Sequence, residues 1–217
     1  MNRLMNPKGS IRSGRPGQDG STLPELLITL AVFSTIIMVI VLLWEQSQQA
    51  YFRSATAAEL QQNARVALEQ MSREIRQAGY DPCRYSTACT SAFDPVVLGV
   101  FPVQTFTATS LWVRADRNAN GDVTPGVGGN PDEENVCFRR AGNQIVRKTT
   151  GVDCTSGGVE LARNITGLTF TYLKANGTAA TVRSDIKLVR IAISAQEVFM
   201  GAPVTVSLSS DVRLRDQ

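Results

Sequence analysis

The sequence predicts an α+β protein in which one long N-terminal helix, half of it in a membrane, packs on an antiparallel β-sheet head. Three observations favour this class. The nineteen residues from Leu26 to Trp44 carry no charge. Residues 45–78 contain neither Pro nor Gly and are rich in helix-forming residues. After Pro82, short β-branched runs alternate with Gly, Asn and Asp, which is typical of strands joined by turns.

Residues 1–20 form a basic segment rich in Gly, Ser and Pro, a composition that cannot build a core. Its charges, Arg3, Lys8, Arg12 and Arg15 against Asp19, account for the whole net charge of +3. The remaining chain is neutral and lacks the basic face that nucleic-acid binding requires, so we exclude that function. The positive-inside rule places this end in the cytoplasm and the head in the periplasm.

Residues 21–44 are expected to form the transmembrane half of the helix. At 1.5 Å per residue, the uncharged run from Leu26 to Trp44 measures about 28 Å, close to the hydrocarbon thickness of a bilayer. A secretory signal peptide would have a shorter apolar core followed by small residues. Here Trp44, Glu45 and Gln46 follow instead, so the segment is interpreted as a membrane anchor.

Residues 45–79 are expected to continue the helix as an amphipathic half. Apolar residues recur there every three or four positions, which predicts one stripe against a sheet. Gly79 suits a left-handed cap, and Asp81-Pro82 forbids continuation, so we expect the helix to end near Ala78. The stripe consists of Leu60, Ala64, Leu68, Met71, Ile75 and Ala78.

Residues 80–217 are expected to form the β-rich head. Hairpins are predicted at Ala141-Gly142-Asn143 and at Ala175-Asn176-Gly177, where Gly and Asn tolerate positive φ. Such short connections favour antiparallel pairing. The predicted strands are Pro95 to Val100, Ser110 to Ala115, Val136 to Arg140, Gln144 to Thr149, Ile165 to Leu173, Ile186 to Ala195 and Val204 to Leu214.

The chain has no histidine, which excludes Ser-His and Cys-His catalysis and His-ligated zinc. The head also shows no nucleophile-base pair and no phosphate loop, so we do not expect an enzyme. Four cysteines, Cys83, Cys89, Cys137 and Cys154, predict two disulfides in an oxidising compartment. We expect Cys83 to pair with Cys89 and Cys137 with Cys154; four buried thiols are the alternative.

Between the basic segment and the apolar run stands Gly20-Ser21-Thr22-Leu23-Pro24-Glu25-Leu26-Leu27. This motif resembles the class III signal of type IV prepilins and type II secretion pseudopilins, in which a glycine ends a leader and a glutamate lies fifth after the cut. The resemblance implies that prepilin peptidase removes residues 1–20 by cleavage between Gly20 and Ser21, and that the new amine of Ser21 is methylated. Ser21 and Asp19 depart from the residues usual in the family.

Glu25 lies at the edge of an uncharged membrane helix, where a carboxylate is costly unless it is paired or near the interface. In the family its partner is the N-terminal amine of a neighbouring subunit, and this pairing would set the axial register of stacked helices. The alternative needs no partner, since the positive N-terminal end of the helix itself stabilises a carboxylate.

The segment from Arg65 to Pro82, RVALEQMSREIRQAGYDP, resembles the PilW family of minor pilins, whose helix ends in an R-x-A-G-Y turn. The resemblance implies a pilin-like minor subunit that primes or caps the type IV pilus. Its implied partners are other minor pilins, the major pilin and the inner-membrane assembly platform. It also implies residence in the bacterial inner membrane and then in a surface fibre. The J-type minor pseudopilin of type II secretion shares this plan and remains an alternative.

Asp116, Asn118, Asn120 and Asp122 alternate as oxygen side chains, with Gly121 in the sixth place, as in an EF-hand calcium loop. The acid expected twelfth is absent, although Asp132, Glu133 or Glu134 could supply it. A membrane-anchored calcium-binding or receptor module is therefore a third candidate function. The alternative for this loop is an Asx-rich turn, which needs these residues for backbone reasons alone.

Overall fold

The computed structural model describes residues 22–83, 103–123, 134–149 and 153–214. The chain divides into two compact units, one ending at Gln49 and the other starting at Ala50. The helix α1 (Leu23–Gln77) begins in the first unit and ends in the second. Every described strand belongs to the second unit.

The described part of the first unit is helical from Leu23 onward, and all its residues are exposed. Ile36, near the middle of the uncharged run, is 51% exposed, and Trp44 at its end is 63% exposed. Among the described residues, α1 is the helix that is long and apolar enough to span a membrane, with a mean hydropathy of 3.0 over eighteen residues. Since no protein core covers these side chains, they require an apolar solvent, which a bilayer supplies.

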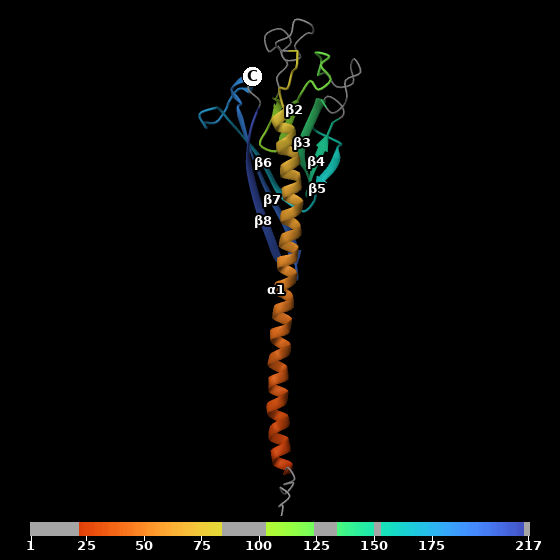
Figure 1. Cartoon of the computed structure of the whole chain (residues 1–217), viewed down its shortest axis with the longest axis vertical. Helices are drawn as coiled ribbons and strands as arrows, with labels where there is room; N and C mark the ends of the chain where they lie inside the picture. Colours follow the sequence, from red (N-terminus) through yellow and green to blue (C-terminus); the bar gives the residue numbers. More distant parts are fainter. Residues whose placement is uncertain (1–21, 84–102, 124–133, 150–152, 215–217) are drawn as a thin grey trace, which may run out of the picture. The chain divides into compact units, whose positions relative to one another are not determined.

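In the second unit, α1 lies beside the strands of the head (Figure 1). Its apolar stripe is buried in one core cluster with residues of both sheets. The buried apolar residues are Leu60, Ala64, Ala67, Met71 and Ile75 of α1, with Ala78 directly after it. The predicted stripe is therefore confirmed with one difference. Ala67, which was not predicted, is fully buried, whereas the predicted Leu68 is only partly buried against the core. The predicted cap is also confirmed, because Gly79 has a φ of +79° and α1 ends two residues earlier.

Five strands form the first antiparallel sheet, in the order β1-β2-β3-β4-β5. Its two-residue connection between β3 and β4 is the predicted hairpin at Gly142-Asn143, with Ala141 paired to Gln144. Neither β1 nor β5 was expected from the sequence, because each contributes only four residues. The bounds are β1 (Val103–Phe106), β2 (Ser110–Arg114), β3 (Asn135–Ala141), β4 (Gln144–Lys148) and β5 (Val159–Ala162).

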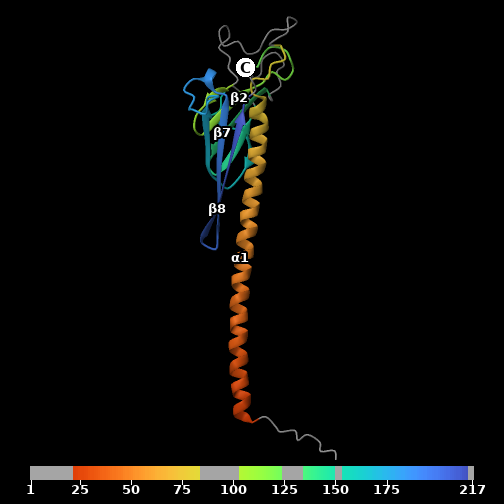
Figure 2. The ribbon, with the colours of Figure 1, turned by 60° about the vertical axis from the view of Figure 1, so that its left-hand side comes forward.

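A second antiparallel sheet has the order β6-β7-β8, formed by β6 (Ile165–Leu173), β7 (Leu188–Phe199) and β8 (Ala202–Arg213). Figure 2 shows β7 and β8 as a long hairpin beside α1. Met200 and Gly201 form its turn, both with positive φ. The turn at residues 174–179 is also present, but a 3-10 helix, η2 (Arg183–Asp185), follows it, and β6 pairs with the later strand β7.

The head therefore contains two antiparallel sheets within the described residues, where the sequence had suggested a single sheet. The predicted strand Pro95 to Val100 lies outside the described residues. An ion pair joins the helix to the first sheet: Arg147 Nε donates to Glu74 Oε1 at 2.8 Å. Because Glu74 is 9% exposed, this contact lies at the edge of the core and fixes the rotation of α1 against β4.

Candidate functional sites

The predicted processing signal begins outside the described residues, since these start at Thr22 and exclude Gly20 and Ser21. Its glutamate, Glu25, lies in the exposed first turn of α1. Thr22 O accepts the N–H groups of Glu25 at 3.0 Å and Leu26 at 3.1 Å. Pro24 fits this turn because its missing N–H would have no helical partner there. The helix thus starts at Leu23, inside the motif and just before the apolar run.

The Cys137–Cys154 disulfide predicted from the sequence is present, with the two Cα atoms 5.7 Å apart. Both cysteines pack with Trp112 in a small buried cluster. The guanidinium of Arg114 covers the Trp112 ring at 4.8 Å from its centroid. Cys83 is also in a disulfide, and its predicted partner Cys89 lies outside the described residues. The described cysteines are those of a protein folded under oxidising conditions.

The predicted calcium loop forms a compact turn after β2. Asp116 is fully buried, and its carboxylate accepts the N–H groups of Ala119 at 2.8 Å and Gly121 at 3.1 Å. Asn118 and Asn120 each accept a backbone N–H two residues on. The loop therefore has the backbone bonds of an Asx-rich turn, and Asp122 is half-buried at its end.

The sequence offered Asp132, Glu133 or Glu134 as the missing acid of this loop, and of these three Glu134 lies within the described residues. It is 1% exposed, and its Oε1 accepts the N–H groups of Arg117 at 2.9 Å and Asn118 at 3.0 Å. Burial raises the pKa of this carboxyl, and the two backbone hydrogen bonds oppose that shift. The sequence gave no reason to expect Glu134 to be the buried acid, because Asp132, Glu133 and Glu134 are consecutive and no local pattern predicts which of them is buried.

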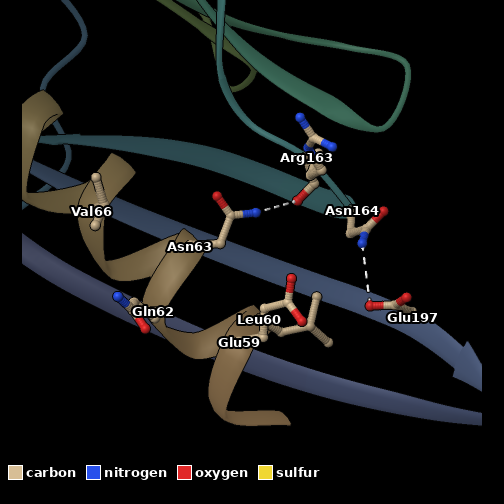
Figure 3. Close-up of a pocket in the computed structure, with 8 residues that line it drawn as sticks. All are labelled: Glu59, Leu60, Gln62, Asn63, Val66, Arg163, Asn164 and Glu197. Atoms are coloured by element: carbon tan, nitrogen blue, oxygen red, sulfur yellow. Dashed lines mark hydrogen bonds between the residues drawn. The ribbon is translucent and has the colours of Figure 1, made fainter. Parts of the chain in front are cut away.

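The second unit also has an open groove of about 440 Å³ between α1, the β5–β6 turn and the end of β7 (Figure 3). Asn63 Nδ2 donates to Arg163 O at 3.0 Å across it, and Asn164 Nδ2 donates to Glu197 Oε2 at 3.4 Å. Its lining contains carboxylates, amides and one guanidinium but no nucleophile beside a base. The groove gives no reason to assign catalysis.

One comparison with known families matches residues 53–214 to the family described as prepilin peptidase-dependent protein B. The match covers the second unit almost completely and excludes the motif around Gly20. The chain belongs to this family. Membership makes it a type IV pilin-related, prepilin peptidase-dependent protein, and the peptidase is therefore one of its partners. No curated protein and no solved structure matches the chain.

The family accounts for the architecture described above. A pilin-like structural protein needs an apolar helix for membrane anchoring and a folded head, and the two units supply these parts.

Proposed function

We propose that this chain is a minor pilin of the PilW type, a structural subunit that primes or caps a type IV pilus. One observation carries the proposal: two separate parts of the chain support the same function. The signal with Gly20, Ser21 and Glu25 precedes an exposed apolar helix, while the family match begins only at Arg53. Since the two stretches do not overlap, they are independent reasons for a prepilin.

In this proposal, prepilin peptidase cuts between Gly20 and Ser21, and the new Ser21 amine is methylated. Residues 21–44 hold the subunit in the inner membrane as a single pass, and the head from residue 80 lies in the periplasm. The disulfides of Cys83 and of Cys137 with Cys154 support that compartment. The subunit then joins other minor pilins, the major pilin and the assembly platform.

Glu25 is proposed to set the axial register by meeting the Ser21 amine of a neighbour. Its position in the first, exposed helical turn leaves the carboxylate accessible to such a partner. Removal of one partner from an ion pair in a low-dielectric place costs several kcal/mol, because the other charge stays unpaired. The register contact therefore distinguishes an assembly helix from a simple anchor.

Processing is tested first. Gly20→Ala should leave the leader attached, since a β-carbon at the cut obstructs the extended substrate backbone. Intact mass would show a product about 2 kDa heavier, at ~110 Da for each leader residue. Wild-type protein that begins at Met1 in a host with active prepilin peptidase would contradict the proposal.

Assembly is tested with Glu25→Gln, with Glu45→Gln at the other end of the apolar run as the matched control. Both variants should be cleaved and inserted normally, because an anchor needs only apolar length. Only Glu25→Gln should be depleted from sheared surface fibres, and Glu25→Lys should be depleted further because like charges then meet. Equal incorporation of all three variants would leave Glu25 without a register role.

The J-type minor pseudopilin remains a second candidate, because processing and architecture are shared. The partners distinguish the two functions. Tagged protein purified from membranes and from sheared fibres should carry minor and major pilins, identified by mass spectrometry. Recovery of secretion-system pseudopilins instead would favour the second candidate and leave the prepilin processing intact.

A further inference from the structure

Apolar side chains gather at the tip of the β7–β8 hairpin, where the hairpin meets α1. The ring centroids of Phe52 and Phe199 lie 6.2 Å apart, and the Tyr51 ring meets Phe52 edge to face at 5.8 Å. Much of this group is open to solvent, since Tyr51 is 70% exposed, Phe52 50%, Val198 65% and Met200 69%. Neighbouring exposed apolar side chains of this kind mark interaction sites. We call these five residues the tip patch.

The backbone of the hairpin turn does not explain why a methionine stands there. Met200 has a φ of +49°, and Gly201 beside it also has a positive φ. Gly and Asn take such positions at low cost, whereas methionine does not. The turn at Gly142-Asn143 between β3 and β4 uses those two residue types. The exposed side chain of Met200 therefore needs a reason other than turn geometry.

The tip is apolar on both faces of the hairpin. Successive side chains of a strand point to opposite faces, so Val198 and Phe199 lie on opposite faces of the end of β7. Phe199 is the one on the side of α1, because its ring contacts Phe52. A docked protein would cover one of these faces, whereas a lipid surface can surround the whole tip. The arrangement therefore favours lipid over a protein partner.

The tip patch is closely tied to the apolar run of α1. Tyr51 follows Trp44, the last residue of that run, by seven positions. Seven residues span about 10 Å in a helix and at most about 25 Å in an extended chain. A bilayer measures about 30 Å across its hydrocarbon and about 40–45 Å with its headgroups. The stretch from Leu26 to Phe52 corresponds to about 40 Å of helix, so a run that fills the hydrocarbon carries Phe52 to the headgroup layer.

The residues next to the tip patch also suit a headgroup layer. Tyrosine is enriched at membrane interfaces, because its ring is apolar and its hydroxyl is polar. Arg53, which is exposed directly after Phe52, carries a guanidinium that matches the geometry of a lipid phosphate. The carboxylate of Glu197, next to Val198, accepts a hydrogen bond from Asn164 Nδ2 at 3.4 Å. Basic and aromatic groups thus accompany the apolar tip, as lipid headgroups require.

We propose that the tip patch binds the lipid surface of the membrane that α1 enters, with Val198 and Met200 among the headgroups beside Tyr51 and Phe52. The head then has two attachments, the covalent one through α1 and the contact at the hairpin tip. Two attachments restrict the motion of the head at the membrane more than one does. The inference rests on the membrane anchor of the proposed function and does not depend on which pilins the subunit joins.

The test places a tryptophan at the tip and measures its quenching by lipid. Full-length protein is reconstituted at one copy per nanodisc in lipids brominated close to the headgroup, and Trp44→Phe leaves the buried Trp112 as the background emitter. In this background, the added emission of Met200→Trp should be about twofold lower in brominated than in unbrominated lipid, because an interfacial tryptophan contacts the bromines.

The matched control is Val182→Trp in the same background. Val182 is 51% exposed and lies just before η2, at the opposite end of β7 from Met200. The twelve residues of β7 span about 37 Å, so a tryptophan there should not be quenched. Val198→Asp, added to the Met200→Trp reporter, should release the tip and restore its emission to the unquenched level.

The native Trp44 tests the anchor separately. If Trp44 is quenched in the otherwise unchanged chain but Met200→Trp is not, the tip contact is overturned and the anchor stands. An unquenched Trp44 overturns the anchor and the inference together. Equal quenching of Met200→Trp and Val182→Trp, or quenching that Val198→Asp leaves unchanged, also overturns the tip contact. Quenching that appears only with two copies per disc would assign the patch to a second subunit instead of lipid.

Discussion

The two halves of α1 are one continuous helix with opposite relations to their surroundings. In the first unit, residues up to Gln49 are exposed and apolar all round over the uncharged run. In the second unit, one face of the same helix is buried against two sheets and the other face is polar. Helical structure alone therefore does not specify what a residue contacts. The pattern of apolar and polar residues along the helix does.

The comparison shows how one helix can be suited to lipid in one half and to a protein surface in the other. A helix that is apolar on all sides satisfies its backbone internally and can lie in lipid. A helix with a single stripe must find a protein surface for that stripe, and here both sheets provide it. An assembly subunit with this construction can present the first half to a membrane while the second half keeps the head folded.

The sharpest test of this difference is a matched pair of methionine truncations. Met71 is 0% exposed in the core, and Met38 is 65% exposed in the apolar run. Met71→Ala should lower the free energy of unfolding of the head by about 2–5 kcal/mol, because it leaves a cavity. Met38→Ala should leave the unfolding of the head unchanged. Thermal unfolding of both full-length variants in detergent checks this, and equal melting temperatures would erase the distinction.

A charge placed in the first half should act on insertion instead. Ile36→Lys, near the middle of the uncharged run, should cost about 2.5–3.5 kcal/mol of membrane insertion while the disulfide-bonded head still folds. The fraction of protein that stays in carbonate-washed membranes measures insertion. Gln48→Lys, beyond the run, is the control and should insert normally. Loss of both variants from the membrane would mean that the span extends past Trp44.

The smallest expected effect concerns the ion pair that fixes the second half. Glu74→Gln should destabilise the head by about 1–2 kcal/mol, because Arg147 then loses a charged partner in a partly buried place. Glu69→Gln removes the same charge from an exposed position five residues earlier and should change stability by less than about 0.5 kcal/mol. Chemical denaturation compares the two, and equal losses would show a general effect of helix charge.

Much of this architecture could be predicted from the sequence. The cap at Gly79 and the hairpin at Gly142-Asn143 follow from residues that tolerate positive φ, and both are present. The turn at Met200-Gly201 was not predicted, because Met seldom adopts a φ of +49°. The strands β1 and β5 were not predicted, because four residues are too few to show a recognisable alternation of apolar and polar side chains.

The candidate sites divide in the same way. The processing signal, Glu25 and the apolar run are consecutive in the chain, so the resemblance to prepilins could be recognised from the sequence, and the family match to residues 53–214 agrees with it. The grouping of Asp81 with Asp116 and the burial of Glu134 depend on the chain that follows α1 meeting the ends of β2 and β3. Only the tertiary structure decided that grouping, because the intervening segments carry no local signal for which carboxylate turns inward. A motif of consecutive residues can be recognised from the sequence, whereas the burial of a side chain depends on how the whole chain packs.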